Sequence, residues 1–114
     1  MEERERRLAE NEALFREVNE RTQAVNQMWS RAAGDEPPFQ IVCECGHADC
    51  SVPLHVSPAL YESVREHGAR FLVASGHELP DVERILERHD ELLVIEKTGA
   101  SKPIAERFDP RKRN

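Results

Sequence analysis

The 114-residue sequence has few aromatic residues, few cysteines and no long hydrophobic run. The aromatic share is 5%, and no segment approaches the roughly 20 apolar residues of a membrane-spanning helix, so the sequence predicts no membrane span. It also has no glycine-rich loop for a phosphate, and Ser75-Gly76-His77 is not a nucleophile elbow. These absences argue against the nucleotide-binding and serine-hydrolase classes.

Only three cysteines are present, an odd number, and the chain begins with a charged run at residues 1–7 rather than an apolar signal segment. Disulfides cannot pair an odd set completely, so a secreted disulfide scaffold is not expected. We therefore expect a cytoplasmic protein whose thiols stay reduced.

Positive charge is scarce in the middle of the chain. The formal net charge is −6; residues 37–101 carry five basic and eleven acidic groups, whereas residues 102–114 carry five basic and two acidic groups. An acidic domain repels phosphate, so only the tail has the right sign for nucleic acid. Its Arg111-Lys112-Arg113 run lacks interleaved aromatic residues and predicts a weak, salt-sensitive contact.

All three cysteines lie within eight residues, in the segment Cys43-Glu44-Cys45-Gly46-His47-Ala48-Asp49-Cys50, called the cysteine loop below. Gly46 gives the backbone the freedom to curl, so that the thiols can point to one centre. Three soft sulfur ligands favour Zn²⁺, which takes four ligands in structural sites. The loop therefore predicts a zinc site that lacks one ligand.

His77 is the preferred fourth ligand because it lies in a turn just after a predicted strand, where Gly76 lets the backbone bring the ring close. Glu78 is placed to orient a ring nitrogen. His47 is the alternative, although its closeness to the cysteines would strain a tetrahedron. The sequence thus predicts Zn²⁺ bound by Cys43, Cys45, Cys50 and His77.

Catalysis at this site is not expected, and we predict that the protein is not an enzyme. A catalytic zinc needs an open coordination position and a neighbouring acid or base, roles for which Glu44 and Glu78 are the candidates. Three thiolates leave the ion little Lewis acidity. A Cys-x-Cys pair can instead oxidise and release zinc, so a thiol-based redox sensor is an alternative function.

Residues 2–33 contain no proline or glycine and consist mostly of good helix formers. Spacings of three and four residues predict a narrow seam along this helix, with Leu14 and Met28 beside it, formed by Leu8, Asn11, Phe15, Val18, Thr22, Val25 and Trp29. Such a seam is buried either against a second copy, as a homodimeric coiled coil, or against the zinc domain of the same chain. We expect the N-terminal helix, residues 1–36, to bind a second copy or another protein.

The breaker cluster at residues 34–38 ends the helix and marks a domain boundary. Residues 37–101 are expected to form a zinc-binding domain with strands at 39–43 and 51–56, a helix after Ser57-Pro58 and a strand at 70–74. Residues 82–97 fit either a helix over 82–89 or a hairpin of 84–88 with 92–97, and we prefer the hairpin. Residues 102–114 are expected to be a flexible basic tail.

The spacing Cys43-x-Cys45-x4-Cys50 is similar to the zinc knuckle that follows the catalytic domain of SET-type methyltransferases, and this resemblance implies only the ligand geometry. More broadly, the chain up to about Lys97 resembles a family of small actinobacterial proteins in its segments Arg7–Glu20, Cys43–Cys45, Phe71–Val73, Gly76–Glu78 and Leu93–Lys97. That resemblance implies an intracellular bacterial protein and no particular activity.

Together these patterns predict an α+β protein, with a long N-terminal helix followed by a small antiparallel sheet held by zinc and one packed helix. The function predicted is a non-enzymatic zinc-binding interaction or regulatory module. A factor that associates with nucleic acid or ribonucleoprotein through the basic tail is an alternative. No small-molecule substrate is indicated.

Overall fold

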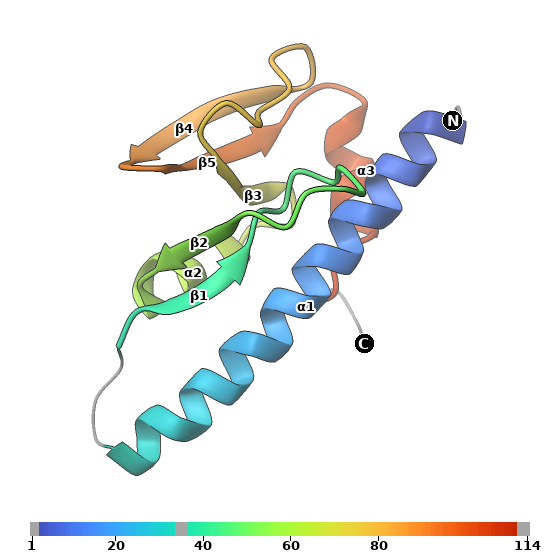
Figure 1. Cartoon of the computed structure of the whole chain (residues 1–114). Helices are drawn as coiled ribbons and strands as arrows, with labels where there is room; N and C mark the ends of the chain where they lie inside the picture. The colour runs from blue at the N-terminus through green and yellow to red at the C-terminus, as the bar shows by residue number, and fades with distance from the viewer. Residues whose placement is uncertain (1–2, 34–36, 112–114) are drawn as a thin grey trace.

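The computed structural model describes residues 3–33 and 37–111. Their elements, in chain order, are α1 (Glu3–Ala33), β1 (Phe39–Val42), β2 (Pro53–Val56), α2 (Pro58–Arg65), β3 (Arg70–Ala74), β4 (Glu83–His89), β5 (Leu92–Lys97) and α3 (Ser101–Arg107). The predicted α+β class is confirmed. The long helix α1 runs along one side of the β-strands, and its C-terminal turns extend beyond them (Figure 1). Among the described helices, none combines the length and the apolar character that a bilayer crossing requires.

The strands form two antiparallel sheets. The first is the β1–β2 hairpin, in which Ile41 pairs with Leu54 and the cysteine loop makes the connection. The second has the order β3-β5-β4. The hairpin predicted within residues 82–97 is confirmed by the pairing of β4 with β5, and the helical alternative is wrong.

The hydrophobic core is centred on β5, which is buried along its whole length. Alternating apolar residues of β1 and β2 join the same core, as do Tyr61 and Val64 of α2. Ser57 begins α2 as predicted, because its side chain accepts a hydrogen bond from the Leu60 N–H at 3.2 Å. These contacts hold both sheets in fixed positions around the cysteine loop.

The helix α1 packs on the sheets through a polar stripe rather than through the predicted seam. Its buried side chains also recur at spacings of three and four, and they are Ala9, Glu12, Arg16, Asn19 and Gln23. Val18, Val25 and Trp29 of the predicted seam are exposed. The predicted seam is therefore not the main face by which α1 docks on its own sheets, and its burial against a second copy stays a prediction. Hydrogen bonds and ion pairs bind the polar stripe to the rest of the domain.

The segment after residue 101 differs from the flexible tail that we expected. Residues Ser101–Arg107 form the helix α3, and its Ala105 is buried. Arg16 donates a hydrogen bond to the Ala105 carbonyl at 2.9 Å, which ties α3 to α1. Pro103 is tolerated because it lies in the first turn, where a backbone N–H has no helical partner. The expected boundary at residues 34–36 and the basic residues 112–113 lie outside the described residues.

Candidate metal centre

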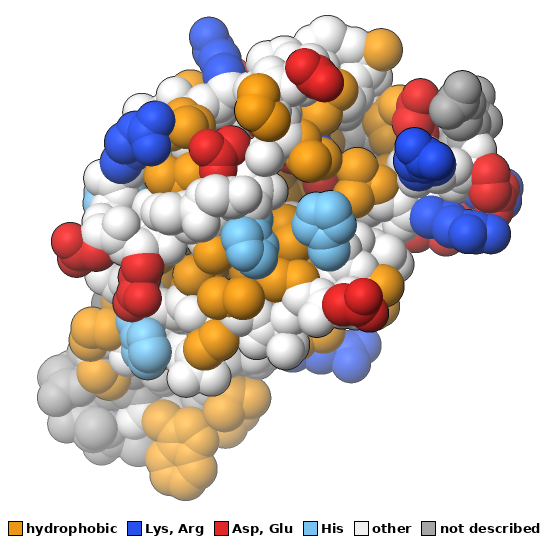
Figure 2. Space-filling view, turned by 45° about the horizontal axis from the view of Figure 1, so that its top comes forward, with side chains coloured by type: hydrophobic (Ala, Val, Ile, Leu, Met, Phe, Trp, Pro, Cys, Tyr) orange, Lys and Arg blue, Asp and Glu red, His pale blue; other side chains and the backbone are white. Residues whose placement is uncertain are grey.

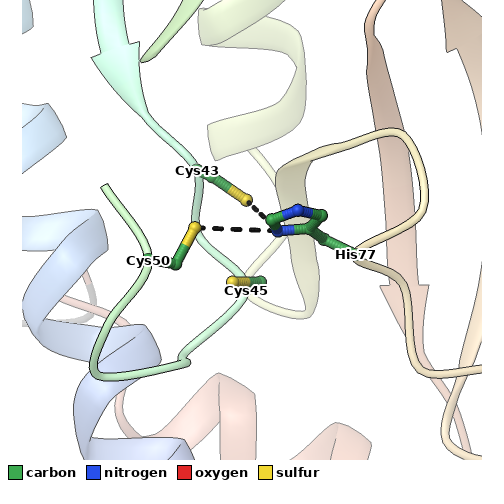
Figure 3. Close-up of side chains that lie close together, drawn as sticks. All are labelled: Cys43, Cys45, Cys50 and His77. Atoms are coloured by element: carbon green, nitrogen blue, oxygen red, sulfur yellow. Dashed lines mark hydrogen bonds between the residues drawn. The ribbon is translucent and has the colours of Figure 1, made fainter. Parts of the chain in front are cut away.

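The side chains of Cys43, Cys45, Cys50 and His77 meet at one point (Figure 3). One donor atom from each lies within 4.8 Å of all the others. The His77 Nδ1 atom is 3.6 Å from Cys43 Sγ and 3.6 Å from Cys50 Sγ. Zinc bonds of about 2.3 Å to sulfur and about 2.0 Å to nitrogen place two tetrahedral ligand atoms about 3.6 Å apart. The donor set and the two distances from His77 therefore fit a tetrahedral zinc ion.

Two connecting segments, each attached to a different sheet, supply these four side chains. The cysteines belong to the connection between β1 and β2, whereas His77 lies in the turn after β3. The two parts touch beside the cluster, where the Glu44 N–H donates to the Leu72 carbonyl at 2.9 Å and the Ala74 N–H donates to Cys43 Sγ at 3.2 Å. A metal ion bound here would link the hairpin to the three-stranded sheet.

The predicted association of His77 with the three cysteines is confirmed, while the alternative, His47, is exposed and lies outside the cluster. Glu78 has a different role from the one predicted. Its carboxylate accepts a hydrogen bond from the Gly76 N–H at 2.9 Å, so it shapes the turn that carries His77.

The thiols are free, and Cys43 and Cys45 are 0% and 2% exposed. Burial raises the pKa of both thiols, which disfavours their thiolate forms. The hydrogen bond from Ala74 acts in the opposite direction on the pKa of Cys43. A divalent cation would supply the positive charge that makes buried thiolates the stable form.

The helix α1 holds the end of β1 and the cysteine loop through hydrogen bonds to their backbone. The Asn19 side chain donates to the Val42 carbonyl at 2.9 Å and accepts from the Val42 N–H at 2.9 Å. Asn11 donates to the Gly46 carbonyl at 3.0 Å. Gly46 has φ +83°, and a Cβ atom added there would lie 2.6 Å from Leu8 Cδ1. The contact between loop and helix thus requires glycine for both its conformation and its size.

Glu44 has a role that our sequence analysis missed. It is fully buried, and its carboxylate accepts hydrogen bonds from the Leu72 N–H at 3.0 Å and from Asn19 Nδ2 at 2.8 Å. Burial raises its pKa, and both hydrogen bonds oppose that rise. Glu44 therefore joins the cysteine loop to β3 and α1. The Cys-Glu-Cys spacing carried a signal for this role, because the residue between two ligands in extended backbone points away from them.

Cys50 is the least buried of the three cysteines, and a shallow depression lined in part by His47, Asp49, Cys50 and His77 opens beside it. Figure 2 shows histidine side chains among hydrophobic ones on one face of the molecule. The cluster is thus shielded by the protein on one side and accessible to small molecules on the other.

No protein-family model, curated protein or solved structure matches this chain.

Proposed function

We propose that this chain is a zinc-dependent, non-enzymatic interaction module that works in the cytoplasm. The observation that carries the proposal is the cluster of three cysteines and one histidine, which joins two sheets at a single point. Four protein ligands fill a tetrahedral zinc, so none of its positions is left for a substrate or an activated water. The three cysteines are not joined by a disulfide, which supports a location in a reducing compartment.

Metal analysis of the purified protein tests the first half of the proposal. We expect a single zinc ion per chain and a large loss of zinc affinity in Cys45→Ser and His77→Ala. His47→Ala is the matched control, because this exposed histidine lies near the cluster without belonging to it. Equal zinc content in all three variants would contradict the proposed ligand set.

The partner that we propose is a second copy of this chain, bound to the exposed apolar face of α1. This face is formed by Leu14, Val18, Val25 and Met28, which are 55%, 42%, 53% and 71% exposed. They occupy the d, a, a and d positions of one heptad frame. The buried polar stripe takes the b and f positions of the same frame, so α1 can bind its own domain with one face and a second copy with the opposite face.

Two further features support a second copy as the occupant. Both sheets lie on the same side of α1 (Figure 1), and the exposed fractions of Leu14, Val18, Val25 and Met28 show that the sheets do not cover the heptad face. Valine at a with leucine or methionine at d is the composition of two-stranded coiled coils. Between Leu14 and Met28, the one charged residue at an a or d position is Arg21. It has Glu17 at 3.3 Å on the preceding turn, so its charge enters the seam already paired.

Sedimentation or light scattering over a concentration series tests the self-association of the zinc-loaded protein. We expect a monomer–dimer equilibrium that the double variant Val18→Glu/Val25→Glu abolishes, because it places charges at both a positions. Gln27→Glu, exposed on the same helix at position c, is the control and leaves the dimer intact. A wild-type monomer at every concentration, or a dimer that survives the double variant, would overturn this part of the proposal.

A thiol-based sensor is a second candidate, favoured by the partial exposure of Cys50 beside an open depression. Mild peroxide should then release zinc, as measured with a coloured chelator, and a thiol reductant should restore binding. Retention of zinc would eliminate this function.

Association with nucleic acid through the tail receives less support. Arg111 forms ion pairs with Glu20 and Glu62, which neutralise its charge.

A further inference from the structure

A cavity of about 340 Å³ lies between the N-terminal turns of α1, the segment before β4, and α3. Its volume is within the range of sites for small ligands. None of its lining residues belongs to the candidate metal centre.

The walls of this cavity are mainly hydrocarbon. Leu8 and Ala9 contribute from α1, Val82 from the opposite wall and Ile104 from α3. Hydrogen bonds fix the far wall, since the Val82 carbonyl accepts from the Thr98 N–H at 2.8 Å. The cavity therefore offers a preformed surface to an apolar group.

Buried charges lie at one end of the cavity. Lys97 and Glu12 line it although they are only 3% and 4% exposed. The Lys97 ammonium is 2.6 Å from a carboxylate oxygen of Glu12 and 2.6 Å from one of Glu83. Two buried carboxylates thus share one ammonium group. Arg16, the next cation along α1, instead donates to the carbonyls of Gly68 and Ala105.

When both are ionised, these two carboxylates outnumber the one ammonium group between them, although Arg16 also adds positive charge near Glu12. Burial is the main cause that raises the pKa of Glu12 to about 7, against the lowering effect of Lys97 and Arg16. Two further acidic residues, Glu5 and Asp81, line the cavity and are exposed to solvent. Lys97 is the one cationic residue among the described residues that line it. An anion would be repelled here, and a cation attracted.

We propose that this cavity binds a small hydrophobic amine, whose hydrocarbon part packs against Leu8, Val82 and Ile104 and whose ammonium group pairs with Glu12. The ligand class is a primary alkyl- or arylalkylammonium ion. This proposal depends neither on the metal centre nor on self-association.

An NMR titration of the zinc-loaded full chain tests the proposal with three probes of similar shape, namely phenethylammonium, 2-phenylethanol and 3-phenylpropionate. We expect shifts at the cavity, with the ammonium ion binding at least about tenfold more tightly than the alcohol or the carboxylate. Glu12→Gln should weaken the ammonium ion by about tenfold and leave the alcohol unchanged, while Glu10→Gln, exposed on the same helix, should change neither.

Two more variants keep the test decisive if Glu12→Gln fails to fold. Asp81→Asn changes only an exposed side chain and should selectively weaken the ammonium ion. Ile104→Trp fills the cavity and should abolish binding of both the amine and the alcohol. Binding of the alcohol as tight as that of the amine, preference for the carboxylate, or absence of shifts at the cavity with all three probes would overturn the proposal.

Discussion

Asn19 is the side chain through which α1 holds both the backbone of β1 and the buried carboxylate of Glu44. Asn19→Ala would leave the Val42 N–H and carbonyl and one Glu44 oxygen without these partners. Buried polar groups that lose a partner cost about 1–3 kcal/mol each. Because Val42 is half-buried and water can replace part of what is lost there, we expect a total loss of roughly 2–4 kcal/mol in the free energy of unfolding. Urea unfolding of the zinc-loaded protein measures it. Gln27→Ala, exposed on the same helix, should change stability by less than about 0.5 kcal/mol, and an equal effect of the two variants would contradict this role.

Glu12 should make stability depend on pH. Its folded-state pKa is raised from 4.5 to about 7 by burial, so between these values the folded chain keeps a proton that the unfolded chain has released. The contribution of Glu12 to the free energy of unfolding should therefore fall as pH rises through this window and level off above about 7. Glu12→Gln removes this contribution.

The measurement is urea unfolding of both proteins at saturating zinc from about pH 5 to about pH 8. Effects of pH on the metal centre are common to both proteins and cancel in the difference. The difference in stability, wild type minus variant, should decrease with pH, and a constant difference would show that Glu12 titrates as an ordinary carboxyl group.

At the scale of elements, the cysteine loop approaches α1 closely at Gly46, where a larger residue would not fit. Gly46→Ala would place a Cβ atom 2.6 Å from Leu8 Cδ1 and 2.7 Å from Glu12 Cγ, at a φ of +83°. Gly99→Ala is the matched control, since Gly99 also has a positive φ, +56°, but faces open space. The control should cost about 1–2 kcal/mol for the backbone alone, and Gly46→Ala about 1–3 kcal/mol more because of the clash. Equal losses in urea unfolding would show that the loop and the helix separate easily.

The strands and the candidate metal-binding residues could be predicted because their signals are local. Alternating residues define β1 and β2, and His77 follows an apolar strand directly. The docking face of α1 could not be predicted in this way. Glu12, Arg16 and Asn19 read as surface residues, and their partners come from distant parts of the chain that only the fold brings together. The helix α3 was missed because Gly99 and Pro103 are typical of loops, although here they flank or begin a helix.

At the scale of the whole molecule, the candidate metal centre joins the hairpin to the three-stranded sheet. Without a bound ion, the buried thiols would lack their link to His77, and the two sheets would be held together by their shared hydrophobic core and a few hydrogen bonds alone. We expect exhaustive chelation to cost at least about 3 kcal/mol and to lower the Tm by more than about 10 °C. Calorimetry of the chelated and zinc-restored protein measures the change. His77→Ala should be insensitive to the chelator, and an unchanged cooperative transition in the wild type would contradict a structural role for the metal.

The order of the ligands along the chain has a consequence for biosynthesis. His77 follows Cys50 by 27 residues, so a growing chain presents its three thiols to the cell well before the imidazole leaves the ribosome. The four candidate ligands would therefore be complete only after β3 and the turn that follows it have emerged, and β5 would pair with β3 later still. Until then, the three thiols of the cysteine loop would face the cell without their fourth partner.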